Sequence, residues 1–250
     1  MRWMVAMAFI ALIGCGNDGS TATDSMPIQS PDDQTGGYLV ATVTPVTGTA
    51  HATLYDAAGT TQLASFSGDA PGAPLSFWWT SAPNQTTRIA LTDDAGAACT
   101  SCQLTSSYTQ VADTFEPNDF MDASALMPAD GQMSAFLFAG RSDGPTDPAA
   151  YDDYYRFTAE PGAVSVQLDN VPADLAARLF LFRADGTEVA RVSNGMRGAA
   201  LTLTPPALTD AAELIVRVSL WDEAPAVAGA GADLPPSFTQ PYRLTVSRSQ

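Results

Sequence analysis

The 250-residue sequence contains no lysine, one histidine and three cysteines, and only 15% of its residues are charged. A typical globular domain has roughly 25% charged residues. The 11 basic residues, all arginine, face 27 acidic ones, which gives a formal net charge of −16. Because no basic run interrupts this negative charge, we expect the folded part to bind neither nucleic acid nor an anionic lipid surface.

The scarcity of histidine limits the chemistry of any catalytic site. His51 lies in an alternating segment typical of a strand, and no Gly-x-Ser-x-Gly motif accompanies it. Zinc would need further histidine or cysteine ligands, and glycine-rich phosphate-binding loops are missing. Close carboxylate pairs are expected by chance in a chain with 27 acids, so they carry little information about glycoside hydrolysis. The sequence therefore predicts a protein that is not an enzyme.

The N-terminus carries a short apolar run typical of an export signal. Arg2 is followed by the apolar stretch 3–13 and then by Gly14 and Cys15. The run is too short for the ~20 residues of a transmembrane helix. Its end resembles the lipobox of bacterial lipoproteins, which implies removal of residues 1–14 and acylation of the Cys15 thiol, with palmitate among the acyl chains. The mature chain would then have 10 arginines against 27 acids, a net charge of −17.

The next segment, residues 15–37, is small and polar and ends in Gly36 and Gly37. This composition predicts a disordered tether between the lipid anchor and the folded part. With Cys15 acylated, only Cys99 and Cys102 remain. Nothing around this Cys-x-x-Cys pair alternates as a βαβ unit, so it predicts a small structural disulfide rather than a redox site.

From residue 38 onward, short alternating segments are separated by Gly, Pro, Asn and Asp, a pattern that predicts antiparallel β structure. The expected strands span 38–43, 51–55, 75–79, 87–91, 108–111, 133–138, 154–158, 164–168, 178–182, 188–192, 201–203, 214–220 and 242–246. Only residues 119–127 suggest a helix. The fold class is therefore all-β, with two tandem antiparallel sandwiches of jelly-roll type after the tether.

The two halves of the exported part resemble each other. The strand and glycine turn at 54–60 match those at 181–187, and an apolar strand and a strand that opens with tyrosine follow in both. Four matches in one order suggest a tandem repeat, with domains at 38–111 and 112–250; two unrelated β domains are the alternative.

The most specific motif lies at the domain boundary. It reads Asp113-Thr-Phe-Glu-Pro-Asn-Asp119, and Tyr151-Asp-Asp-Tyr-Tyr-Arg-Phe157 and a closing Tyr-Arg-Leu-Thr-Val follow it. This order resembles the bacterial pre-peptidase C-terminal domain over most of 112–250, and residues 38–111 resemble a degenerate copy. The resemblance implies a β-sandwich found beside secreted peptidases and in exported proteins, used for adhesion or ligand binding.

The resemblance also implies a calcium site in some family members. The matching residues here are Glu116, Asn118, Asp119 and Asp153, and Tyr151 stands where the family often has another acid. Asp152 would point to the other face of its strand. Calcium prefers 6–8 hard oxygen ligands, which carboxylates, an amide and backbone carbonyls supply. The alternative is a metal-free turn in which Asn118 or Asp119 caps the following helix.

Together these patterns predict a monomeric, non-enzymatic lipoprotein of the bacterial envelope, sorted to the outer membrane. Its partner would be a protein or a polysaccharide. A carbohydrate platform at Trp78-Trp79 is weakly suggested, but neighbouring strand residues face opposite ways, so one ring should be in the core. The rival function is an accessory or glycan-acting secreted hydrolase that uses surface carboxylates.

Overall fold

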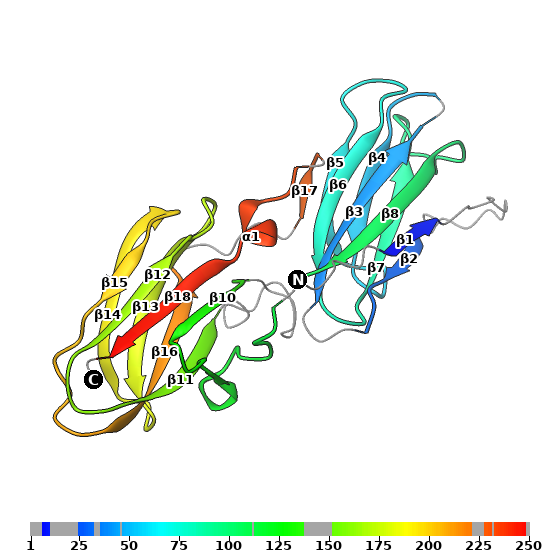
Figure 1. Cartoon of the computed structure of the whole chain (residues 1–250). Coiled ribbons are helices and arrows are strands. Elements are labelled where there is room, and N and C mark those ends of the chain that lie inside the picture. Colours follow the sequence, from blue (N-terminus) through cyan, green and yellow to red (C-terminus); the bar gives the residue numbers. More distant parts are fainter. Residues whose placement is uncertain are drawn as a thin grey trace. The chain divides into compact units, whose positions relative to one another are not determined.

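The computed structural model describes residues 7–10, 25–32, 36–45, 47–111, 113–137, 152–221, 228–231 and 233–248, with only the backbone for 7–10. Cys15, Tyr151 and most of the predicted signal lie outside these residues. The chain forms two compact units, shown in Figure 1. Unit 1 contains residues 1–110 and 226–233, and unit 2 contains residues 111–225 and 234–250. The short segment 226–233 therefore belongs to unit 1, although the sequence predicted one continuous second domain.

Unit 1 is a sandwich of two antiparallel sheets. Sheet A has the strand order β1-β8-β3-β6-β17, and sheet B has the order β2-β7-β4-β5. The strands are β1 (Met7–Ile10), β2 (Met26–Gln29), β3 (Gly37–Thr44), β4 (His51–Tyr55), β5 (Gln62–Ser67), β6 (Leu75–Ser81), β7 (Thr86–Thr92), β8 (Gln103–Gln110) and β17 (Ala228–Ala230). Alternate residues of the facing strands form the core, in which the rings of Phe66 and Phe77 stack at 4.7 Å.

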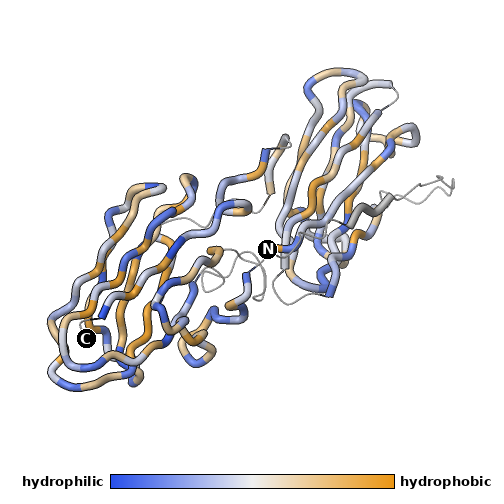
Figure 2. Tube along the Cα trace, in the orientation of Figure 1, coloured by the Kyte–Doolittle hydropathy of each residue, from blue (hydrophilic) through white to orange (hydrophobic). Residues whose placement is uncertain are grey.

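Unit 2 is a second sandwich. Sheet C has the order β14-β13-β16-β11-β9, and sheet D has the order β10-β18-β12-β15. The elements are η1 (Met121–Ala123), β9 (Ala125–Leu126), β10 (Gln132–Ala135), β11 (Asp153–Ala159), β12 (Val164–Asp169), β13 (Ala176–Arg183), β14 (Glu188–Arg197), β15 (Leu201–Leu203), β16 (Ala212–Leu220), α1 (Pro236–Thr239) and β18 (Tyr242–Arg248). Figure 2 shows apolar segments along the strands of both sandwiches, with hydrophilic residues at many turns. The all-β sandwich prediction is therefore confirmed.

The two units share one strand topology. Sheet A without β17 matches sheet D, strand for strand, as β1-β8-β3-β6 against β10-β18-β12-β15. Sheet B matches sheet C without β9, as β2-β7-β4-β5 against β11-β16-β13-β14. The matched hairpin turns carry Gly59 and Gly186 at φ of 76° and 84°, a conformation that favours glycine. This is the topology expected of a tandem repeat.

Two local predictions were wrong. The segment 26–29, assigned to the disordered tether, forms β2 and pairs with β7, because Met26 and Ile28 pack against the core of unit 1. The helix expected at 119–127 is only the 3-10 turn η1, which is followed by the two residues of β9 pairing in parallel with β11. Residues 7–10, inside the predicted signal, form β1 and pair with β8 at the edge of sheet A, so removal of residues 1–14 would leave β8 as that edge.

Cys99 and Cys102 form a disulfide with their Cα atoms 5.5 Å apart. It closes a turn after β7, where the Cys99 amide donates to the carbonyl of Leu91. Because the closed loop is so short, its loss should cost about 2 kcal/mol or less of the free energy of unfolding.

We therefore expect the double change Cys99→Ser and Cys102→Ser to lower the melting midpoint by only a few degrees. Calorimetry of the full chain with and without reductant would test this. The wild-type midpoint should fall to that of the double variant on reduction, while the variant itself should not respond. A collapse of unit 1 on reduction would contradict the prediction.

Candidate functional site

The segment 113–119 packs against the beginning of β11. The Tyr154 amide donates to the carbonyl of Asn118 at 2.9 Å. Asp113 accepts hydrogen bonds from the amides of Phe115 at 2.9 Å and Phe136 at 2.7 Å, which join the segment to the residues after β10. These contacts place the first acidic motif beside the second, as the resemblance implied.

Asp153 points inward from β11 and is buried. Its Oδ2 accepts hydrogen bonds from the hydroxyls of Tyr155, at 3.2 Å, and Tyr242. The two hydroxyls are also 2.6 Å apart. The carboxylate therefore lies at the polar end of the core of unit 2, held by one tyrosine from each sheet.

Three other acidic residues lie within electrostatic reach of Asp153. Burial, and then the charges of Glu116, Asp113 and Asp119, raise the pKa of Asp153 well above its usual value. Burial likewise raises the pKa of Asp113, although two backbone amides act against it. The four carboxyl groups therefore repel one another when they are ionised, and a bound cation would relieve that repulsion.

Asn118 adds an unusual feature to this cluster. The residue is 1% exposed, yet neither polar atom of its side chain makes a hydrogen bond within the described residues. Burial, and then the charges of Asp153 and Asp113, raise the pKa of Tyr155. The Asn118 side chain lies near the Tyr155 hydroxyl and acts against this rise, but hydrogen-bond geometry is not reached. Leaving a buried amide unpaired costs about 1–3 kcal/mol, so a cation or hydrogen-bond donor bound to the amide oxygen would offset that cost.

The donors fit calcium in type: carboxylates and an amide oxygen that lacks a partner. Within the described part of the chain, no three acidic, histidine or cysteine side chains gather closely enough to enclose a metal. Asp113 already uses both oxygens for backbone amides. The resemblance names Glu116, Asn118, Asp119 and Asp153 as ligands, and the three acids among them do not come close enough together here to form a metal site by themselves.

The alternative prediction, in which Asn118 or Asp119 caps the following helix, was wrong. Phe120, not Asn118 or Asp119, is the N-cap of η1, and no side chain caps it. Asp152 does point away from Asp153, because strand neighbours alternate, and it forms an ion pair with Arg217.

His51 contacts a serine and an aspartate. Its Nδ1 lies 3.0 Å from Ser67 Oγ, and its Nε2 lies 3.3 Å from Asp94 Oδ1. In a serine hydrolase the amide after the nucleophile commonly helps to bind the oxyanion. Here the Gly68 amide donates to the Ala50 carbonyl instead. The arrangement is therefore a cross-strand hydrogen-bond network, without the oxyanion donor that a nucleophilic Ser67 would need.

Trp78 and Trp79 do not form a platform. Both are nearly fully buried, Trp79 in the core and Trp78 on the opposite face of β6. The expectation that one ring lies in the core is confirmed, and the suggested carbohydrate platform there was wrong.

The outer face of sheet C carries a row of rings and guanidinium groups that the sequence reading missed. Arg178 lies 5.6 Å from the Trp221 ring and 5.8 Å from the Phe180 ring, and Arg217 lies 5.1 Å from Phe180 and 5.7 Å from Tyr154. We call these five residues the arginine-aromatic row. Trp221 is 46% exposed. The alternation of β13 and β16 could have indicated these positions, because Arg178 and Arg217 each stand between two residues that face the core.

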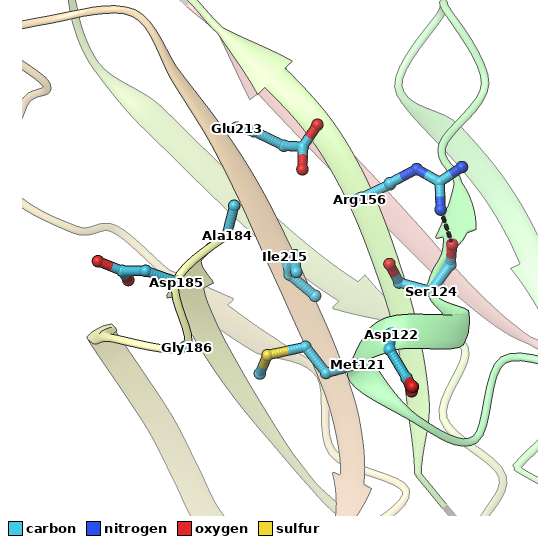
Figure 3. Close-up of a pocket in the computed structure, with 9 residues that line it drawn as sticks. All are labelled: Met121, Asp122, Ser124, Arg156, Ala184, Asp185, Gly186, Glu213 and Ile215. Carbon is cyan, nitrogen blue, oxygen red and sulfur yellow. Dashed lines mark hydrogen bonds between the residues drawn. The ribbon is translucent and has the colours of Figure 1, made fainter.

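A shallow pocket of about 620 Å³ opens beside this row. Its lining comes from η1, from the β13–β14 turn and from β11 and β16: Met121, Asp122, Ser124, Arg156, Ala184, Asp185, Gly186, Glu213 and Ile215. In Figure 3, the guanidinium of Arg156 extends away from Glu213 toward Ser124, and Asp185 points away on the opposite side. Arg156 donates to the Ser124 carbonyl, and no ion pair joins it to Glu213.

No family model matches the chain, and no curated protein matches it. Among solved structures, a protein from Parabacteroides distasonis ATCC 8503 is 8% identical over 99% of this chain and 89% of that one, with a TM-score of 0.33. The CBM22-1-CBM22-2 tandem domain of Paenibacillus barcinonensis Xyn10C is 11% identical over 98% and 91%, with a TM-score of 0.27. The PBSX exported protein XepA is 12% identical over 97% and 86%, also at 0.27. TM-scores this low carry no argument about function.

Proposed function

We propose that this chain is a non-enzymatic lipoprotein of the bacterial envelope, anchored through Cys15, that binds a protein or polysaccharide partner. Within the described residues no helix is long and apolar enough to cross a membrane. The proposal includes membership of unit 2 in the pre-peptidase C-terminal family, on the motifs at 113–119 and 151–157. Incorporation of a labelled fatty acid, lost in a Cys15→Ala variant, would test the anchor.

The observation that carries the binding role is the arginine-aromatic row. Trp, Tyr and Arg are the side chains most enriched at binding hot spots. Six of the chain's 11 basic residues lie on strands of sheet C, so this sheet is set apart from an otherwise acidic molecule. Arg178 forms no ion pair with a described carboxylate, and its Nε donates to the Leu220 carbonyl. Its charge is therefore available to a partner.

The non-enzymatic part of the proposal rests on the contacts of His51 and of the acidic cluster. The serine beside His51 lacks the neighbouring oxyanion donor. Asp153 is enclosed by tyrosines in the core, where a substrate could not reach it. Both candidate sites are therefore better explained by structural or metal-binding roles.

We propose calcium as the cofactor of the acidic cluster, held by Glu116, Asn118, Asp119 and Asp153. The unpaired amide of Asn118 and the raised pKa of Asp153 support this choice. The ion would join the segment before η1 to β11. Its role would be structural, because the cluster lies on the core side of β11 and the arginine-aromatic row lies on the outer face.

We expect Trp221→Ala to reduce binding of the purified chain to isolated envelopes of the producing organism by at least about tenfold, as expected for the loss of a hot spot of 1.4 kcal/mol or more. The side chain is half exposed, so the melting midpoint should change by only a few degrees. Pull-down with quantitative detection would measure the binding.

Leu63→Ala provides the control for Trp221→Ala. Leu63 is also about half exposed, but it lies on β5 in unit 1. The Leu63→Ala variant should bind envelopes as strongly as the wild type does. Equal binding by Trp221→Ala and the wild type would show that this face is not the binding surface.

A further inference from the structure

We propose that removal of residues 1–14 turns the edge of sheet A into an interface, at which two copies of the mature chain pair through β8 in antiparallel orientation. This inference rests on the proposed function, because cleavage before Cys15 is the step that removes β1. The processed protein would then be a dimer, whereas the sequence predicted a monomer.

The edge of β8 accepts a strand in the full chain. β1 lies along it (Figure 1), with Met7 opposite Tyr108 and Ile10 opposite Thr105. On its other side, β8 pairs with β3 over residues 103–110 without a register shift. Cleavage before Cys15 would take β1 away and leave a regular strand of eight residues as the edge. The main-chain groups on such an edge are a template for another strand.

The repeated topology shows that this position is normally filled. In unit 2, β10 occupies the place that matches β1, and it pairs with β18. β10 belongs to the mature chain, so the edge of β18 stays covered after cleavage. Of the two units, unit 1 alone loses the strand at this position. A strand from outside the mature chain would restore the arrangement that unit 2 keeps.

β8 lacks the features that usually protect an edge strand from pairing, which are charged residues, proline and bulges. Its sequence, Gln-Leu-Thr-Ser-Ser-Tyr-Thr-Gln, has neither charge nor proline. The edge strand β14 carries Glu188, Arg191 and Arg197, and its pairing with β13 shifts register. β5 is also uncharged, but it is shorter and its pairing with β4 shifts register. Within the described residues, β8 would be the longest regular edge without charge.

A second copy fits this edge because β8 is its own complement. Leu104 and Tyr108 lie in the core of unit 1, so Thr105 and Ser107 face outward. If Ser106 lies opposite Ser106 on a two-fold axis, Leu104 of one copy lies opposite Tyr108 of the other. Thr105 then lies opposite Ser107. Each apolar residue therefore meets an apolar residue, and the net charge of −17 places no like charges opposite each other across the ladder.

The length of the ladder also favours a second copy. The pairing between β1 and β8 runs over residues 105–108. Self-pairing centred on Ser106 would run from residue 103 to residue 109. A second β8 would therefore supply a longer ladder than the one that cleavage removes. Anchoring both copies in one membrane raises their effective concentration and so favours the pairing further.

The test is a Ser106→Cys variant of the full chain, expressed in the producing organism. In the proposed register the two residues 106 face each other, and such pairs have Cα atoms about 4.5–5.5 Å apart. This separation is suitable for a disulfide. We expect the processed variant to form a disulfide-linked dimer in the oxidising envelope, visible on a non-reducing gel. Ser65→Cys, on the uncharged edge strand β5, is the control and should stay monomeric.

Two further changes in the Ser106→Cys background test the register. Thr105→Asp with Ser107→Asp places two aspartates opposite each other twice, so the crosslinked fraction should fall at least about tenfold. Thr105→Lys with Ser107→Asp places lysine opposite aspartate and should crosslink as Ser106→Cys alone does. Both pairs of changes are on the outward face, so calorimetry should show similar melting midpoints.

The outcomes separate this inference from the proposed function. Processed Ser106→Cys that forms no dimer, equal crosslinking by Ser65→Cys, or equal crosslinking by the two register variants would overturn the pairing. Fatty-acid labelling of Cys15 reports the anchor independently, so the lipoprotein proposal would survive each of these results. A monomeric chain whose mass shows that residues 1–14 are retained would overturn both.

Discussion

Replacing Asp153 with asparagine should stabilise the calcium-free protein at pH 8 and abolish its stabilisation by calcium. In the folded chain, burial and the neighbouring carboxylates raise the pKa of Asp153 well above its usual value of 3.8. Asparagine keeps an oxygen that can accept from the hydroxyls of Tyr155 and Tyr242. It removes the carboxylate that must either hold a proton or carry a buried charge.

The sign of the pH effect follows from the raised pKa. Between 3.8 and the folded pKa, the folded state holds a proton that the unfolded state has released. Stability from this group is therefore present at low pH and falls by up to about 1.4 kcal/mol for each pH unit in that window. Without calcium, the two proteins should be similar near pH 4, and the advantage of Asp153→Asn should increase toward pH 8.

With calcium bound, the wild type should become more stable than Asp153→Asn at pH 8. At 100 times its Kd, a ligand that binds only the folded state adds about 2.7 kcal/mol. For a domain of this size the midpoint would rise by roughly 5–10 °C. Asp153→Asn loses a proposed ligand and should not respond.

Calorimetry with calcium and then with chelator, at pH 4 and pH 8, measures both effects. Asp210→Asn, a change at an exposed aspartate in the same unit, should behave as the wild type. An unchanged wild-type midpoint on adding calcium would remove the metal proposal. Without calcium, the wild type should lose stability relative to Asp153→Asn between pH 4 and pH 8. If it does not, the electrostatic argument is contradicted.

Replacing Gly229 with valine should detach β17 from the edge of sheet A. Gly229 pairs with Trp78, and a Cβ atom at residue 229 would lie 2.4 Å from a carbon of the Trp78 ring. The ring is buried and cannot easily move. Overpacking of this kind costs typically about 1–3 kcal/mol, and a strand of three residues has little pairing energy to oppose it.

Hydrogen exchange of the full chain would detect the detachment. The Gly231 amide, which donates to the Ser76 carbonyl at 2.7 Å, should lose at least about tenfold of its protection. Ala230→Val is the control, because Ala230 is exposed and its larger side chain can extend into solvent. Protection in Gly229→Val equal to that in Ala230→Val would show that β17 tolerates the larger residue.

The sequence predicted most strands because each has one face in a core, and that burial produces the period of two. It missed β2 because Met26 and Ile28 are the only residues of that strand that pack on the core, in a segment that is otherwise polar. It missed β17 for a different reason. Ala-Gly-Ala has no pattern, and its place is decided by the fit of Gly229 against Trp78, a residue far away in the sequence.

The candidate sites were predictable to different degrees. The motifs at 113–119 and 152–153 indicated an acidic cluster, and the structure brings Glu116 and Asp119 within electrostatic reach of Asp153. The arginine-aromatic row was not predicted, because its members come from three strands whose neighbours are determined only by sheet order. The carbohydrate platform suggested at Trp78-Trp79 was wrong, because two adjacent tryptophans in a sequence do not show what covers the outer face of their strand.

The assignment of β17 to unit 1 also affects the order in which the molecule can assemble. Ala228 pairs with Trp79, a separation of 149 positions (228 − 79). Pairings between residues so far apart in sequence form late, because loop-closure entropy must be overcome first. A chain synthesised from its N-terminus can build β3 to β8 early, but sheet A gains its last strand only after residue 230 has emerged. The first sandwich in sequence is therefore completed only when most of the second has already been made.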